Sequence, residues 1–75
     1  MYIDEAIKED KHDMDTLRRG DKGQQVKVLQ KLLGGLDIDG LFGKKTFDAV
    51  CAYQVEHTLE VDGIVGPMTW GKLLA

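Results

Sequence analysis

The sequence contains a single cysteine, Cys51, and therefore cannot form an internal disulfide framework. Because Cys51 falls inside an apolar helical pattern, we expect it to pack as a small hydrophobic residue rather than to act as a reactive thiol. The chain lacks an apolar run of about 18 residues, so no membrane-spanning helix is predicted. No basic region followed by an apolar stretch opens the chain, so no signal peptide is visible. With 75 residues the chain has room for one domain with a modest core, which excludes a deep pocket between two lobes.

Residues that carry catalysis or bind metals are equally scarce. The only histidines are His12 and His57, and His57 lies six positions from Cys51, which places these two on different faces of a helix. A zinc enzyme or a hydrolase needs a cluster of ligands or a set of acid, base and nucleophile. We therefore expect no catalysis, no bound metal and no cofactor. The net charge of -3 also argues against a nucleic-acid partner.

Acidic residues are concentrated at the start of the chain. Residues 1–16 carry six acids against two lysines, a balance of -4, whereas residues 17–75 carry eight bases against seven acids, a balance of +1. This change in composition predicts a domain boundary near Leu17. We expect residues 1–16 to form an acidic linker or a short extra helix that adds little to the core, and residues 17–75 to form the folded domain.

One segment of the chain occurs twice. Residues 36–43 read LDIDGLFG, and 23 positions later residues 59–66 read LEVDGIVG. The match continues through a threonine and then an aromatic residue in each copy. It fails only at the two positions between the last glycine and the threonine, where Lys44-Lys45 stands against Pro67-Met68. Because two copies are too few for a solenoid, we interpret them as one loop design that starts two helices.

The repeated loops have the composition of tight turns that lead into helices. In each copy an aspartate precedes a glycine, a pair that favours a turn because Gly adopts positive φ and the carboxylate accepts backbone N–H bonds. Three residues later a second glycine falls where a helix N-cap is expected, and the following threonine should bond back to the first turn. The residues assigned to these turns and caps are Asp39, Gly40, Gly43, Asp62, Gly63 and Gly66.

Three helices follow from these starts and from the apolar periodicity. Residues 21–24 read DKGQ, a capping box for a first helix that ends at Gly34. A second helix is predicted over residues 44–57. A third is predicted over residues 67–74, with Pro67 at its first position, where the missing N–H is harmless.

The apolar residues of these elements define the expected core. The apolar pairs at 41–42 and 64–65, which lie in the loops, should pack into the core. Trp70, Leu73 and Leu74 should face inward from the third helix. The predicted fold is all-α, a compact three-helix bundle with two Asp-Gly turn loops.

Three segments of the chain carry a family resemblance. Residues 17–33 read LRRGDKGQQVKVLQKLL, residues 38–54 read IDGLFGKKTFDAVCAYQ, and residues 59–73 read LEVDGIVGPMTWGKL. In order, these segments resemble three signatures of the peptidoglycan-binding domains at the ends of bacterial and phage cell-wall hydrolases. The signatures are L-R-x-G-x-x-G-x-x-V-x-x-L-Q-x-x-L, V-D-G-x-aromatic-G-x-x-T-x-x-A-V-x-x-F-Q and G-L-x-V-D-G-x-V-G-P-x-T-W-x-x-L.

The chain departs from the family pattern in two places. The connection after Leu33 is short, GGL at residues 34–36, where the family often has a longer loop. In addition, Tyr53 stands where the family usually has Phe, and His57-Thr58 stands where it usually has Asn-Gly.

The resemblance implies a binding module rather than an enzyme. Such a module binds cell-wall peptidoglycan and targets a fused or partner hydrolase to its substrate. We accordingly expect a monomer that acts at the cell wall or outside the cell, released by a phage or supplied by a longer precursor, with no membrane or nucleic-acid partner.

Side chains suited to the two parts of peptidoglycan can be chosen by their chemistry. Cationic groups suit the carboxylates of stem peptides, aromatic rings suit the apolar faces of sugars, and amides can bond to either. The candidate ligand-binding residues are Arg18, Arg19, Gln30, Lys44, Lys45, Tyr53, Gln54 and Trp70. For the aromatic residues and the glutamines, a structural role in the core remains an alternative.

A calcium-binding, dockerin-like interaction module is the alternative from another class. The sequence DIDG at residues 37–40 and the duplication are similar to half of an EF-hand loop. That loop needs an acid six residues after its glycine, where both copies have threonine, and the second copy keeps only Asp62 among the early acids. Calcium binding therefore lacks ligands, and peptidoglycan binding is the preferred interpretation.

Overall fold

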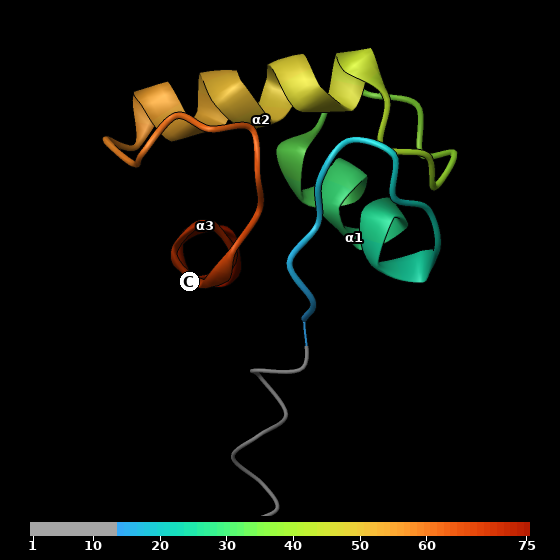
Figure 1. Ribbon diagram of the computed structural model, residues 1–75, viewed down its shortest axis with the longest axis horizontal. Helices are drawn as coiled ribbons and strands as arrows, with labels where there is room; N and C mark the ends of the chain where they lie inside the picture. The colour runs from blue at the N-terminus through green and yellow to red at the C-terminus, as the bar shows by residue number, and fades with distance from the viewer. Residues whose placement is uncertain (1–13) are drawn as a thin grey trace, which may run out of the picture.

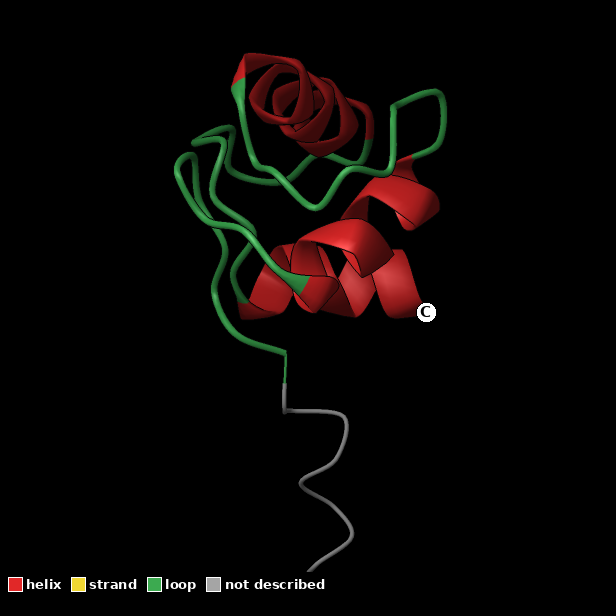
Figure 2. Ribbon diagram, turned by 90° about the vertical axis from the view of Figure 1, so that its right-hand side faces the viewer, coloured by secondary structure: helices red, strands yellow, loops and turns green. Residues whose placement is uncertain are grey.

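The computed structural model describes residues 14–75, and its three helices confirm the predicted all-α three-helix bundle. Helix α1 spans Gln24–Leu33, α2 spans Lys44–Glu56 and α3 spans Pro67–Leu74. Figure 1 shows α2 lying across the bundle, with α1 and α3 beneath its two ends, and the side view of Figure 2 again places α2 over the other two. None of the helices in residues 14–75 has the length and apolarity needed to cross a bilayer.

Glycine occupies the N-cap position of every described helix. The N-caps of α2 and α3 are Gly43 and Gly66, as predicted, and that of α1 is Gly23. The predicted capping box is wrong, because Asp21 Oδ2 instead accepts the backbone N–H of Arg18 at 2.9 Å and closes a turn ahead of the helix. No side chain caps any of these N-termini, so the predicted back-bonding by the two threonines is wrong as well.

The end of α2 contains an unusual backbone conformation. The helix ends at Glu56, one residue before the predicted end, and His57 is its C-cap. The next residue, Thr58, has a φ of 60° in the left-handed region that favours glycine. The backbone N–H of Leu59 then bonds to the carbonyl of Gln54 at 2.8 Å, which turns the chain back toward α3.

Seven buried apolar side chains from every element form the core. They are Leu17, Val26, Leu29, Phe42, Val50, Val65 and Trp70. Each repeated loop thus contributes only the second residue of its apolar pair, since Leu41 is exposed and Ile64 is half-buried. Leu73 packs against the core as predicted, but Leu74 is exposed, because it lies at the last position of α3, where the chain ends its contacts with the bundle.

The segment ahead of α1 joins the two loops through backbone hydrogen bonds. Leu17 and Val65 exchange N–H···O bonds of 3.0 and 2.8 Å and form an isolated antiparallel bridge. Three residues on, Gly20 donates its N–H to the carbonyl of Phe42 at 2.9 Å, and Phe42 donates to Asp21 at 2.9 Å. The residues that bring the loops together are therefore part of the fold, although they belong to no helix or strand.

Contacts with the core begin before the predicted boundary at residue 17. Met14 packs against the core cluster, and Trp70 donates its indole N–H to the carbonyl of Asp15 at 2.9 Å. The boundary itself remains a prediction, and the predicted linker or extra helix falls largely on residues 1–13, outside the described residues.

These contacts predict a difference between two truncations. Removing residues 1–16 should lower the free energy of unfolding by about 1–3 kcal/mol relative to removing residues 1–13, because Trp70 loses its acceptor and the core loses Met14. Urea denaturation of the two truncated proteins measures this difference. Equal stabilities would mean that residues 14–16 contribute nothing to the fold.

Candidate ligand-binding site

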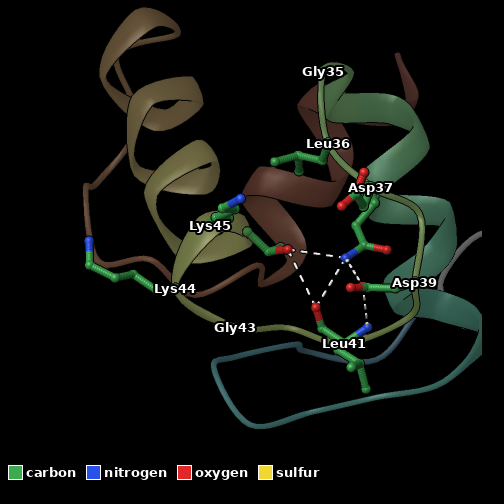
Figure 3. Close-up of a pocket in the computed structure, with 10 residues that line it drawn as sticks. Gly35, Leu36, Asp37, Asp39, Leu41, Gly43, Lys44 and Lys45 are labelled. Atoms are coloured by element: carbon green, nitrogen blue, oxygen red, sulfur yellow. Dashed lines mark hydrogen bonds between the residues drawn. The ribbon is translucent and has the colours of Figure 1, made fainter.

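A buried glutamine on α1 holds the first repeated loop. Gln30 is 2% exposed, and its Nε2 lies 3.0 Å from Asp39 Oδ1, 3.0 Å from the carbonyl of Leu41 and 3.1 Å from Thr46 Oγ1. Its Oε1 accepts the backbone N–H of Gly40 at 3.0 Å. This set of contacts, drawn in part in Figure 3, is called the Gln30 network here. One amide thus joins α1, the loop and the first turn of α2.

A second glutamine repeats the arrangement one helix later. Gln54 on α2 is 1% exposed, and its Nε2 lies 3.0 Å from Asp62 Oδ1, 3.0 Å from the carbonyl of Ile64 and 3.1 Å from Thr69 Oγ1. Its Oε1 accepts the backbone N–H groups of Gly63 at 3.0 Å and Asp62 at 3.2 Å. The Gln54 network joins α2, the second loop and α3.

The two loop aspartates are hydrogen-bonded as carboxylates. Asp39 Oδ1 accepts the N–H of Leu41, which is the main cause of its lowered pKa, and the Gln30 amide adds to the effect. The pKa of Asp62 is also lowered, chiefly by the N–H of Ile64, against a small opposing effect of burial. Both side chains are exposed at the protein surface, so these bonds orient the turns while the carboxylates stay ionised.

The two Asp-Gly turns require glycine. Gly40 and Gly63 have φ values of 76° and 71°, which L side chains rarely adopt. At Gly63 the constraint is also steric, because a Cβ there would collide with the ring of Phe47. Each turn therefore brings backbone close to a neighbouring side chain, and the loops have little freedom to rearrange.

The first loop and the start of α2 enclose a cavity of about 380 Å³, the first pocket. Its lining residues are Gln30, Gly35, Leu36, Asp37, Asp39, Leu41, Gly43, Lys44, Lys45 and Thr46. In Figure 3 the Lys45 side chain runs along the pocket toward Leu36, whereas Lys44 points away. Lys44 Nζ instead pairs with Asp48 Oδ2 at 2.9 Å, so Lys45 is the cation that faces the pocket.

The N-terminus of α2 adds to the positive potential at this pocket. Its N-cap Gly43 has no side chain to satisfy the first backbone N–H groups, and the first turn carries no acid. Unsatisfied N–H groups at a helix start attract anions. On the opposite wall, Figure 3 places the Asp37 carboxylate close to Leu36. The pocket thus presents positive and negative groups on different sides.

The second loop forms a smaller cavity of about 220 Å³ at the start of α3, the second pocket. Its lining residues are Gln54, Leu59, Glu60, Asp62, Ile64, Gly66, Pro67, Met68 and Thr69. The two pockets therefore occupy corresponding places in the two copies of the repeat. Each has a glutamine, an aspartate and a threonine at its base.

Four of the eight predicted ligand-binding residues line these pockets. Gln30 and Lys44-Lys45 line the first and Gln54 the second. The two glutamines are buried and their amides are hydrogen-bonded within the protein. These contacts agree with a structural role, the alternative that the sequence left open for them.

The other four predicted residues lie outside both pockets. Arg18 is exposed in the turn before α1, and the guanidinium of Arg19 lies 5.8 Å from the centre of the Phe47 ring. Tyr53 is half-buried, with its ring 4.1 Å from that of His57. Trp70 is 4% exposed and packs in the core, so its ring presents no free face.

Several lining residues were missed from the sequence. Asp37 and Glu60 occupy the same position of the repeat and line the first and second pocket respectively. Met68, which lines the second pocket, stands opposite a lysine of the first copy. The aligned copies pair Asp37 with Glu60 and Lys45 with Met68, but nothing in the sequence shows that these positions line a cavity. Within residues 14–75 no group of three or more His, Cys, Asp or Glu side chains is arranged to hold a metal ion.

The glutamine networks predict large losses of stability. Gln30→Ala and Gln54→Ala should each lower the free energy of unfolding by about 2–4 kcal/mol, because buried N–H and C=O groups lose their partners and a cavity remains. Gln24→Ala, at the exposed first position of α1, is the control and should stay within about 0.5 kcal/mol of the parent. Chemical denaturation measures all three. A loss at Gln30 or Gln54 no larger than the control would contradict a structural role.

The lowered aspartate pKa values predict loss of stability in acid. Since the folded-state pKa of Asp39 and of Asp62 lies below the ordinary aspartate value of 3.8, their contribution is complete above that pH and is lost as pH falls through the folded-state value. Melting temperatures from pH 6 to pH 2 should therefore fall less steeply for Asp62→Asn than for the parent. Parallel curves would show that this carboxylate does not couple protonation to folding.

The sequence matches a known protein family. The family described as "Putative peptidoglycan binding domain" matches residues 22–73, which include both loops and nearly all of the three helices. The chain is 40% identical over 65 residues to the zinc D-Ala-D-Ala carboxypeptidase of Streptomyces albus G, and the match covers 77% of this chain and 26% of that enzyme.

Solved structures show the same relation. The crystal structure of the Burkholderia AP3 phage endolysin matches with a TM-score of 0.79 and 49% identity, over 81% of this chain and 25% of that protein. The SleB N-terminal domain matches with a TM-score of 0.78 and 32% identity, over 81% of this chain and 90% of that domain. The chain thus corresponds to about a quarter of the carboxypeptidase and of the endolysin.

These matches confirm the resemblance found in the sequence and do not favour the dockerin-like alternative. They also agree with a binding module rather than a catalytic domain. The chain belongs to the peptidoglycan-binding domain family of cell-wall hydrolases.

Proposed function

We propose that the chain, as a monomer, anchors a larger cell-wall hydrolase by binding the stem peptide of peptidoglycan, with a carboxylate of that peptide in the first pocket. The observation that carries the proposal is the combination of Lys45 with the uncapped N-terminus of α2 on one side of a 380 Å³ cavity. Both attract a carboxylate, and a cationic donor makes a stronger hydrogen bond than a neutral one. The family itself implies action at the cell wall or outside the cell.

The chemistry of the opposite wall of the first pocket favours the C-terminal end of a peptide over a simple anion as the ligand. Asp37 lines the same pocket as Lys45, and its carboxylate can only accept hydrogen bonds while ionised. Next to the terminal carboxylate of a peptide stands an amide N–H, which is a donor. A stem-peptide end therefore offers one group to each wall, whereas an inorganic anion would be repelled by Asp37.

The aromatic residues favour the peptide over the glycan. Stacking on a sugar needs an exposed aromatic face, and Trp70 is buried in the core. One side of the Tyr53 ring is occupied by His57, and neither ring lines a pocket. Among the described residues the pockets instead carry charged and amide groups, which suit peptide chemistry.

The two adjacent lysines allow a matched test. Lys45→Gln should weaken binding to purified, teichoic-acid-free sacculi by about three- to tenfold, because the first pocket loses its cation. Lys44→Gln changes the formal charge equally but removes a lysine that pairs with Asp48 and points away, so its effect should be at most about twofold. Quantitative co-sedimentation measures both variants.

Further measurements in the same assay distinguish charge-dependent binding from calcium-dependent binding and from hydrolysis of the wall. Binding should weaken with added salt and be unaffected by EDTA, and no soluble wall fragments should be released. Equal losses for the two lysine variants would mean a general effect of charge and would overturn the pocket assignment. Loss of binding in EDTA would point to calcium.

A further inference from the structure

The second pocket is built like the first but lined by different chemistry. In the repeat, Lys44-Lys45 is replaced by Pro67-Met68, so neither of the two lysines that line the first pocket has a counterpart in the second. Its acid at the equivalent position is retained as Glu60. The base is built in the same way, because Gln54 repeats every contact of Gln30 and also accepts the backbone N–H of Asp62. A common scaffold therefore presents two different surfaces.

The charge of the second pocket is uniformly negative. Among residues 14–75, Glu60 and Asp62 are the only ionisable residues that line it, whereas two acids and two lysines line the first pocket. Asp62 Oδ1 is occupied by Gln54 and Ile64, and within residues 14–75 no hydrogen bond reaches its Oδ2. Within this part of the chain, the pocket therefore has one carboxylate oxygen of Asp62 that accepts no hydrogen bond, and it is also lined by the exposed Glu60.

Apart from the buried Gln54 and Thr69 at its base, the rest of the lining is apolar and partly exposed. Leu59 and Ile64 are half-buried, and Met68 is 75% exposed at the start of α3. Pro67 at the first helical position has no N–H, so the start of α3 offers an anion one donor fewer than the start of α2. An anion is therefore disfavoured on two counts, and a ligand with an aliphatic part and a positive end fits best.

We propose that the second pocket binds a primary ammonium group at the end of an aliphatic chain, the form taken by the free side-chain amine of a diamino acid in a stem peptide. The aliphatic part lies against Ile64 and Met68, and the ammonium group lies between Glu60 and Asp62. The inference rests on the proposed function, since it assigns a second part of the same peptide ligand. The inference goes beyond the proposed function because it assigns opposite charge preferences to the pockets of the two copies.

Both pockets lie against the same helix, α2. Thr46 lines the first pocket and Gln54 the second, and both lie on α2, eight positions apart. At 1.5 Å per residue the axial separation is about 12 Å. An extended peptide covers that distance in about four residues. Two such subsites can engage one peptide or two neighbouring ones, and simultaneous contact strengthens weak individual interactions.

A small probe tests the second pocket independently of the first. N-acetylcadaverine carries one ammonium group on a five-carbon chain, and N,N′-diacetylcadaverine is its neutral control. In NMR titrations of the full chain, the amine should give saturable shifts at Glu60, Ile64 and Met68, and the neutral compound should give none there. Because the probe has no carboxylate, this result does not depend on Lys45 or on the first pocket.

Two single-charge variants provide the matched control. Glu60→Gln removes an acid of the second pocket, whereas Glu56→Gln removes an exposed acid of α2 that lines neither pocket. Glu60→Gln should weaken binding of the amine by about two- to fivefold and Glu56→Gln should leave it unchanged. Acetylating the free amines of sacculi should weaken the binding of the parent protein to the sacculi by a similar factor. The same treatment should leave the binding of the Glu60→Gln variant to sacculi unchanged.

The outcomes separate this inference from the proposed function. Shifts of equal size with the neutral compound, or equal effects of the two variants, would overturn the ammonium subsite. Met68→Lys gives a further check, because a cation in the second pocket should repel the amine, and tighter or unchanged amine binding would contradict the inference. If Lys45→Gln left sacculus binding intact while the amine still bound near Glu60, the proposed function would fail and this inference would stand.

Discussion

The side-chain amide of a buried glutamine is the contact on which the shape of each repeated loop depends. In both copies the amide contacts an aspartate, a backbone carbonyl and a threonine, and its oxygen accepts a glycine N–H. A helix end and an eight-residue loop would otherwise leave these polar groups buried without partners, which is costly in so small a domain. Because one side chain satisfies several groups, the loop acquires a fixed shape without a disulfide or a metal.

The pockets follow from this arrangement. Each glutamine draws the Asp-Gly turn toward its own helix, and the turn leads directly to a glycine N-cap and the next helix. The space left between the turn and the new helix start becomes the pocket. The residues at the first two helical positions then line it without contributing to the core, since Lys44, Lys45, Pro67 and Met68 are all exposed. The residues that stabilise the fold and the residues that line the outer part of the pockets are thus different.

Much of the fold could be predicted from the sequence because it depends on local signals. The glycine N-caps and Pro67 located two helix starts, and the apolar periodicity located the helices themselves. The capping box at Asp21 failed because its carboxylate finds a nearer backbone partner in the preceding turn. Leu74 was expected to be inward from its periodicity, but periodicity does not show where neighbouring contacts end.

The site was less accessible to sequence reasoning. The glutamines are 24 positions apart and the loops 23, so the repeat does not reveal that each glutamine serves its own loop. Nor does the sequence distinguish Lys44 from Lys45, since both are exposed lysines at a helix start. Their difference comes from helix geometry, because Asp48 lies one turn after Lys44 and holds it away from the pocket.

The residues that hold each loop in shape are different from the residues that line the outer part of its pocket, and this has a consequence for how the lining can change. The dipeptides at 44–45 and 67–68 differ completely between the copies, yet the hydrogen bonds beneath them are the same. A duplicated loop can therefore change the side chains that line its pocket by exchange of two surface residues, with no repacking of the interior. Transplanting these dipeptides between copies would exchange the charge of the two pockets while leaving the hydrogen bonds beneath them in place.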